Sequence, residues 1–236
     1  LFNAGSSFYP SRLTTAAETA IKSFWDHIYN YGSYADANLS QLWYIDGSEN
    51  HDLMRKQAKF FMSLALKSDP SYANSDLADG YSVTEHADAW ANYYYYWFNQ
   101  RARKGILVEI ASPIYAKYSL SCIYNIRDFA PDQLTRDHAE DFLTLIYADY
   151  ALEILNGARG GAKSRSYRGK YSNFGQMASF FPLYQLYLNY GETTSIDFEN
   201  GSYTLLPLIT SDYVMPLKVM DLALYPADKG NYEYVS

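Results

Sequence analysis

The chain of 236 residues is 48% hydrophobic and 19% charged, which excludes a disordered protein and allows a substantial core. Its net charge of −7 argues against general nucleic-acid binding, and no apolar run reaches the roughly 20 residues of a membrane-spanning helix. The single cysteine, Cys122, excludes an internal disulfide and a multi-cysteine zinc site, and its apolar neighbours predict a buried, inert thiol.

The chain begins Leu-Phe-Asn-Ala, with neither an initiator Met nor a charged and apolar leader. It ends GNYEYVS, without a recognisable terminating signal. We therefore expect a processed piece of a longer polypeptide, secreted or periplasmic. The lone cysteine does not decide the compartment, since many exported proteins lack disulfides.

Helices are predicted along most of the chain from apolar residues spaced three and four apart. Thr14–Tyr31 has this spacing and is followed by Gly32, a common helix stop. Glu49–Lys67 comes next. Val83–Arg103 follows, and its four consecutive tyrosines lie between residues that favour a helix over a strand.

The second half of the chain continues this pattern with more interruptions. Pro113 suits the first turn of a helix over Ile114–Phe129. The remaining predictions are helices over Pro131–Leu155, Phe174–Tyr190 and Ser211–Leu224, with an irregular or β-like piece over Glu192–Tyr203.

These elements predict an all-α fold in a single domain that spans residues 1–236. Two packings fit the pattern: a compact bundle, or helical hairpins packed as a complete or incomplete α/α toroid. Long helices with polar, aromatic-rich starts favour the toroid, because helix ends and loops would then line a cleft on one face.

Aromatic residues are frequent, with 26 Tyr, 12 Phe and 4 Trp. An aromatic ring stacks on the apolar face of a sugar, and the tyrosine hydroxyl stays at a wet edge. Trp90, at the start of the run WANYYYYW, is a candidate substrate-binding residue on this basis. The alternative for any one of these rings is packing between helices.

The stretch DGSENHDLMRK, residues 46–56, crowds acids, an amide and an imidazole at a predicted helix start. Asp46 is the expected N-cap, and Glu49 three residues later completes a variant of the capping box. Capping does not account for Asn50 or His51. Asn50 shares the side of the apolar stripe and His51 lies nearer its flank, so both are candidates for a site at the helix start.

A second candidate region, NGARGGAKSRSYRGKY, is rich in glycine and basic residues and has no acid. Glycines let the backbone approach a ligand, and arginine forks bind carboxylate or sulfate. The alternative is a solvated loop that balances acids on the preceding helix. The candidate substrate-binding residues here are Arg159, Lys163, Arg165 and Arg168.

Two further polar regions precede helices. Tyr115 and Tyr118 are three residues apart and share a helix face, where either could exchange a proton, although both could equally be core-edge aromatics. Glu85, His86 and Asp88 begin another helix, but Glu-His-x-Asp is not a recognised metal-ligand spacing. We therefore expect no metal site and no cofactor.

Asn50 and His51 at a helix start, Tyr115 and Tyr118, and an arginine-rich loop together resemble the α/α-toroid polysaccharide lyases, the chondroitin AC, alginate and heparinase II/III-like group. The resemblance implies β-elimination on an anionic, uronic-acid polysaccharide. Asn50 would neutralise the C5 carboxylate, His51 would remove the C5 proton, and Tyr115 or Tyr118 would protonate the leaving oxygen. Such families usually spread these groups over more sequence and carry a downstream β-sandwich domain. No such domain is visible in these 236 residues, which a truncated chain would explain.

Two other functions fit the same residues. One is an α/α-toroid glycoside hydrolase that uses paired carboxylates. The other is a non-catalytic glycan-binding or assembly protein whose tyrosines form the contact surface. The sequence does not predict an oligomeric state. The carboxylates considered for the hydrolase are Glu49, Asp52, Glu85 and Asp88.

Overall fold

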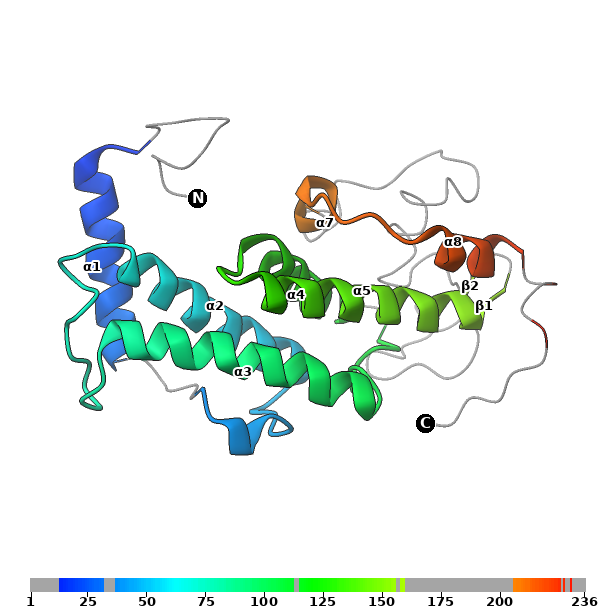
Figure 1. The fold of residues 1–236 in the computed structure, drawn as a ribbon, viewed down its shortest axis with the longest axis horizontal. Coiled ribbons are helices and arrows are strands. Elements are labelled where there is room, and N and C mark those ends of the chain that lie inside the picture. The colour runs from blue at the N-terminus through cyan, green and yellow to red at the C-terminus, as the bar shows by residue number, and fades with distance from the viewer. Residues whose placement is uncertain are drawn as a thin grey trace. The chain divides into compact units, whose positions relative to one another are not determined.

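The computed structural model describes residues 13–31, 37–112, 115–155, 158–159, 206–225, 227 and 230. This part of the chain is all-α, as predicted (Figure 1). Two strands of two residues each, β1 and β2, pair in antiparallel fashion. The elements are α1 (Thr15–Tyr31), the 3₁₀ helix η1 (Leu39–Gln41), α2 (Glu49–Lys67), α3 (Val83–Arg103), α4 (Ala116–Phe129), α5 (Gln133–Glu153), β1 (Ile154–Leu155), β2 (Ala158–Arg159), α7 (Leu206–Thr210) and α8 (Leu217–Leu224).

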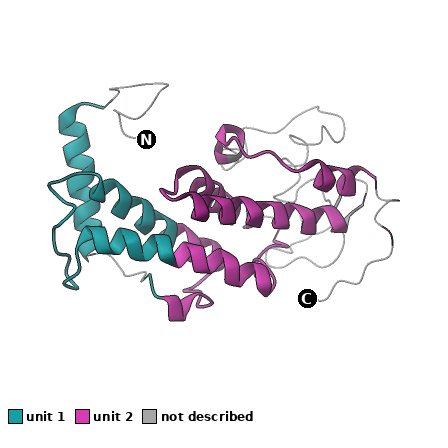
Figure 2. Cartoon of the chain, in the orientation of Figure 1, with its two compact units in different colours: residues 1–38, 55–92 teal, residues 39–54, 93–236 magenta. Residues whose placement is uncertain are grey.

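Two compact units divide the chain (Figure 2). Unit 1 comprises residues 1–38 and 55–92, and unit 2 comprises residues 39–54 and 93–236. Helices α2 and α3 each contribute to both units, with the first turns of α2 and the second half of α3 in unit 2. The single domain and the toroid arrangement stay predictions.

In unit 1, a chain of polar side chains joins α1 to α3 and to the loop before it. The indole N–H of Trp90 donates to the hydroxyl of Tyr29 at 2.8 Å, and that oxygen lies 3.1 Å from Nδ1 of His86. Nε2 of His86 lies 2.9 Å from the carboxylate of Asp79. These bonds give partners to the polar atoms of buried aromatic side chains, which burial requires.

A buried lysine binds the C-terminal end of α1 in the same unit. The ammonium of Lys59 donates to the carbonyl oxygens of Ile28 and Tyr29, at 3.4 and 3.2 Å, and lies 4.4 Å from the centre of the Tyr29 ring. Those carbonyls belong to the last turn of α1, where the helix dipole favours a positive charge. Lys59 therefore binds the C-terminus of α1 to α2.

In unit 2, the tyrosine run is helical and buries one stripe of α3. Tyr93, Tyr94, Trp97 and Phe98 are buried, at the spacing expected for one helix face. The rings of Trp97 and Phe98 lie 5.5 and 5.4 Å from the ring of Phe142 on α5. These contacts form an aromatic core between α3 and α5.

Helices α4 and α5 form a hairpin, also in unit 2. Asp132 caps α5, because its carboxylate accepts the backbone N–H of Thr135 at 2.7 Å. The hydroxyls of Tyr124 and Tyr147 bond to each other at 2.7 Å inside the hairpin. Cys122 is buried in α4, and burial raises the pKa of its thiol to about 12, which confirms the buried thiol predicted above.

The last predicted helix is shorter than expected. Residues 211–216 are not helical and α8 begins at Leu217, while the short helix α7 was not predicted at all. Pro216 disfavours the helical conformation for the residue before it. Side chains of the 211–213 segment also bind α4 and α5, which holds the segment out of a helix.

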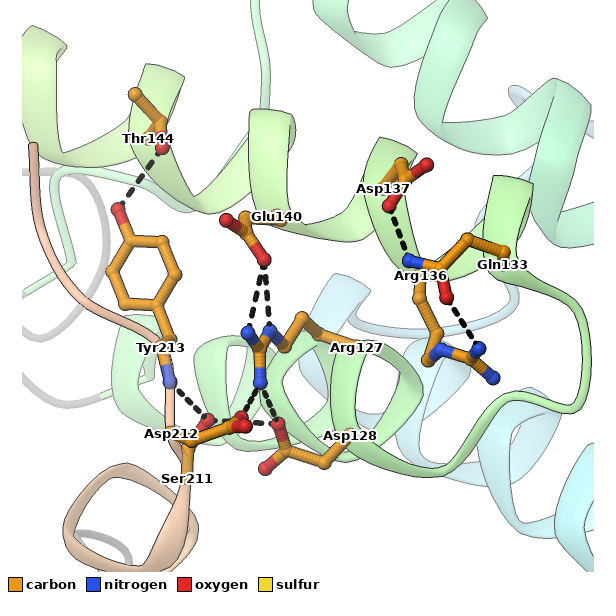
Figure 3. A network of polar contacts seen from close by, with 10 residues as sticks. All are labelled: Arg127, Asp128, Gln133, Arg136, Asp137, Glu140, Thr144, Ser211, Asp212 and Tyr213. Carbon is orange, nitrogen blue, oxygen red and sulfur yellow. Dashed lines mark hydrogen bonds and ion pairs between the residues drawn. The ribbon is translucent and has the colours of Figure 1, made fainter.

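Figure 3 shows these bonds around Arg127. Its guanidinium pairs with Asp128 of α4 at 2.9 Å, with Glu140 of α5 at 3.0 Å, and with Asp212. The hydroxyl of Ser211 donates to Asp128 at 2.8 Å. One cation thus fastens the 211–213 segment to the α4–α5 hairpin.

The other predicted boundaries agree closely with the structure. Helices α2 and α3 have the predicted ends, and α1 begins one residue later than predicted. The helices α4 and α5 begin two residues later than predicted, at Ala116 and Gln133, and α5 ends at Glu153, since Ile154 already belongs to β1. The helix predicted at Phe174–Tyr190 and the irregular piece at Glu192–Tyr203 lie outside the described residues.

Candidate functional site

The first turn of α2 is built differently from the capping box that the sequence predicts. The helix begins at Glu49, and the backbone N–H of Asp52 donates to the carbonyl oxygen of Ser48 at 2.9 Å. The side chain that reaches back is that of Asp52, whose carboxylate accepts the N–H of Asp46 at 3.4 Å. Asp46 as the N-cap and Glu49 as its capping partner were therefore wrong.

Glu49 instead forms a buried ion pair. Its carboxylate accepts Nη1–H of Arg101 at 2.9 Å and the backbone N–H groups of Val108 and Glu109 at 3.0 and 2.7 Å, with 3% of the side chain exposed. Burial raises the pKa of the Glu49 carboxyl above its ordinary value, while the two N–H bonds and Arg101 act in the opposite direction. Both carboxylate oxygens are thus engaged in holding the 107–112 segment.

Glu109 in turn binds the start of α2. Its carboxylate accepts the backbone N–H of Asn50 at 3.4 Å, one of the N–H groups that have no partner within the first turn of a helix. Each of the two glutamates therefore accepts a backbone N–H from the other's segment. This exchange fixes the 107–112 segment against the start of α2.

The same segment continues to the start of α4. The N–H of Ser112 donates to the carbonyl oxygen of Glu109 at 2.9 Å, and the hydroxyl of Ser112 accepts the N–H of Tyr115 at 3.0 Å. Ser112 is buried, and Tyr115 is the residue that precedes α4. A continuous series of hydrogen bonds thus joins the helix start that carries Asn50 and His51 to the one that carries Tyr115 and Tyr118.

Of the four predicted catalytic residues, one is buried, one is exposed and two are half-buried. Asn50 is buried, and its side-chain oxygen accepts the hydroxyl of Ser48 at 2.9 Å. His51 is exposed beside it. Tyr115 and Tyr118 are half-buried, and the ammonium of Lys117 lies 5.4 Å from the centre of the Tyr118 ring.

The backbone is strained just before the 107–112 segment. Gly105 has φ 111° and Ile106 has φ 61°, so two consecutive residues lie in the left-handed half of the map. A β-branched residue rarely adopts this conformation, and such strain is typical of functional sites. The two residues turn the chain at the end of α3 so that Val108 and Glu109 face Glu49.

Arg101 lies between two indoles. Its guanidinium carbon is 4.6 Å from the centre of the Trp43 ring and 5.3 Å from that of Trp97, and the residue is 2% exposed. Nε of Arg101 has no hydrogen-bond partner among the described residues. Trp43 is 39% exposed, and the ammonium of Lys104 lies 5.6 Å from its ring centre.

The predicted substrate-binding residues lie away from the start of α2 in the chain, and three of them are outside the described residues. Trp90 is 1% exposed and belongs to the Tyr29 hydrogen-bond network of unit 1, so it is a core residue here. Arg159 lies on β2, and Lys163, Arg165 and Arg168 lie outside the described residues.

Two of the carboxylates considered for a hydrolase have structural partners in unit 1. Glu85 accepts the N–H and the hydroxyl of Ser82, each at 2.8 Å, at the start of α3. Asp88 pairs with Lys67 at 2.6 Å. Hydrogen bonds from the Ser82 backbone and side chain lower the pKa of Glu85, which suits a helix cap better than a general acid.

Sequence reasoning missed Arg101, Glu109 and Trp43. Arg101 is the partner of a residue 52 positions away, and nothing local indicates that pairing. The available signal for Trp43 was a Trp-Tyr pair directly before the polar stretch.

The fold and the site define an all-α protein in which hydrogen bonds through Glu109 and Ser112 join the starts of α2 and α4, and a buried carboxylate–guanidinium pair ties the start of α2 to the end of α3. Neither a protein family, nor a curated protein, nor a solved structure matches this chain. In the part of the chain that the structure describes, every helix is too short or too polar to cross a membrane. Those same residues include no group of three or more His, Cys, Asp or Glu side chains that could hold a metal ion.

Proposed function

We propose that this chain is a polysaccharide lyase that cleaves an anionic, uronic-acid polysaccharide by β-elimination at the joined starts of α2 and α4. The observation that supports this most is the hydrogen-bond series from Glu49 through Glu109 and Ser112 to Tyr115. It links the helix start that carries an amide and an imidazole to the one that carries two tyrosines. Those are the residue kinds that β-elimination needs.

In the proposed reaction, His51 removes the proton at C5 of the uronate. The electron pair of that C–H bond becomes the C4–C5 double bond, and the C4–O bond breaks with its electron pair going to the leaving oxygen. Tyr115 or Tyr118 donates the proton that this oxygen takes. The products are an unsaturated uronate end and a new reducing end, so atoms and charge balance without water or a cofactor.

Asn50 is the proposed neutraliser of the uronate carboxylate; since it is 2% exposed, the proposal requires the first turn of α2 to shift when the substrate binds. Ser48 holds its side-chain oxygen at 2.9 Å, which directs the amide nitrogen to act as the donor. A donor in a dry site stabilises the negative charge that develops in the transition state more than a donor in water does. The start of α4, whose first turn carries no acidic residue, also favours a bound anion through its dipole.

The hydrolase alternative has less support from the described contacts. Glu49 uses both carboxylate oxygens on Arg101 and on backbone N–H groups, so it is poorly placed to exchange protons with a substrate. Glu85 caps a helix and Asp88 pairs with a lysine. A glycan-binding protein without catalysis stays as an outcome of the test.

The test is a screen of alginate, chondroitin, heparin, pectin and ulvan for a product that absorbs in the ultraviolet. We expect one of these polymers to give product, and His51→Ala to lower kcat about 10²–10⁴-fold. Tyr115→Phe and Tyr118→Phe identify which tyrosine is the acid. His27→Ala, on the exposed side of α1, is the matched control. Absence of product from every polymer, or full activity in His51→Ala, would contradict the proposal.

A further inference from the structure

An exposed indole precedes the helix start that carries Asn50 and His51. Trp43 lies in the loop between η1 and α2 and is 39% exposed, and its neighbour Tyr44 is 58% exposed. A single exposed ring is common on a folded chain, so what distinguishes Trp43 is the basic side chains against its ring, Arg101 and Lys104.

Trp43 is held rigidly from within the protein. Arg101 lies 4.6 Å from its ring centre, and Arg101 is in turn fixed by the 2.9 Å pair with Glu49 and by contact with Trp97. A ring that is already ordered loses little entropy when a ligand stacks on it. The link through Arg101 and Glu49 also places Trp43 in the same connected structure as Asn50 and His51.

The charges at this ring select the kind of ligand. An aromatic face is electron-rich, and by itself it disfavours an anionic partner. Here the guanidinium of Arg101 is already paired with Glu49, so the exposed ammonium of Lys104, at 5.6 Å from the ring centre, supplies the positive charge at the ring. This ammonium offsets the repulsion, and because Lys104 is exposed it can meet a carboxylate or sulfate on a stacked sugar.

We propose that Trp43, with Arg101 and Lys104 against its ring, is a stacking platform for an anionic sugar residue of the polysaccharide substrate. This inference rests on the proposed function, because it assigns a binding subsite to the same substrate. Trp43 and Lys104 contact the sugar, and Arg101 acts through Trp43 as a positioning residue.

The experiment measures binding of alginate and pectin oligosaccharides to the full chain carrying His51→Ala, by calorimetry, with cellohexaose as the neutral probe. Trp43→Ala is expected to weaken binding of the anionic probe about tenfold or more. Lys104→Gln is expected to weaken it about threefold to tenfold, with a smaller effect at high salt. The matched controls are Arg103→Gln, which removes a nearby exposed charge, and Tyr96→Ala, which removes an exposed ring of α3.

Four results would overturn the platform: unchanged binding in Trp43→Ala, equal losses in Lys104→Gln and Arg103→Gln, cellohexaose binding as tightly as the anionic probes, or no binding of any probe.

Failure of the platform can be told apart from failure of the lyase proposal. If wild type gives no unsaturated product but Trp43→Ala still weakens binding, the platform stands on a glycan-binding protein. If wild type gives product and Trp43→Ala leaves KM unchanged, the lyase stands and the platform fails.

Discussion

Replacing Arg101 by Met tests whether the buried pair with Glu49 holds the candidate site together. The change removes a 2.9 Å charge-assisted bond and leaves the Glu49 carboxylate, 3% exposed, with only the N–H groups of Val108 and Glu109. Breaking one side of a buried ion pair costs about 3–5 kcal/mol. Because two N–H donors stay, and because the Met stem still packs against Trp43 and Trp97, we expect the free energy of unfolding to fall by about 3 kcal/mol.

The dependence of this loss on pH is the more specific signature. Burial raises the pKa of Glu49 in the folded chain above its pKa in the unfolded chain. The stability linked to protonation of Glu49 is therefore fully present below the unfolded-chain pKa and is lost as pH rises through the folded-chain pKa. The charge of Arg101 lowers the pKa of Glu49, so removing Arg101 raises the folded-state pKa of Glu49 further. The loss in Arg101→Met should therefore be smaller near pH 5 than near pH 8, because the unpaired carboxyl can protonate.

The assay is urea unfolding followed by circular dichroism at several values between about pH 5 and pH 8. Adding Glu49→Gln to Arg101→Met should remove the pH dependence of the loss. Arg103→Met, at the exposed end of the same helix, should change stability by no more than about 0.5 kcal/mol. A loss below about 1 kcal/mol, or one that does not vary with pH, would refute the reasoning.

Three further substitutions test other parts of the fold by the same unfolding assay. Gly105→Ala should cost about 1–3 kcal/mol from backbone strain alone, since φ is 111° and an added Cβ meets nothing within 4 Å; Gly105→Asn should cost less, and equal costs would contradict this account. Lys59→Met should cost about 1–3 kcal/mol because it leaves two carbonyls of α1 without their buried donor, whereas Lys67→Met, in an exposed pair, should cost no more than about 1 kcal/mol. Arg127→Gln should cost about 1–2 kcal/mol and speed proteolysis within 206–216, since it frees Asp212 from the α4–α5 hairpin; unchanged proteolysis would show that the segment is held by other contacts.

The helices with a regular apolar spacing could be predicted from the sequence almost to the residue, as α2 and α3 show. Their boundaries are local properties, since they depend on spacing and on the residues at each end. The segment 211–216 could not be predicted in this way. Its conformation depends on Arg127, which is distant in sequence, pairs with Glu140 of α5 and holds Asp212 against the hairpin.

The candidate site shows the same division. The sequence singles out Asn50 and His51 because capping leaves them without a role. It assigns Glu49 to capping, and that assignment is wrong because the partner of Glu49 is a guanidinium on another helix. Which side chains pair in a buried network depends on tertiary packing, so the pairing cannot be predicted from spacing along the chain.

The most direct test of the central claim is the mass of the products from whichever anionic polysaccharide the chain cleaves. β-Elimination gives oligosaccharides with an unsaturated end that are lighter by one water molecule than the products of hydrolysis. We predict this unsaturated series from the wild-type chain, and its loss in His51→Ala with the His27→Ala control unaffected. Products that have gained water, or an unsaturated series that survives in His51→Ala, would contradict the account.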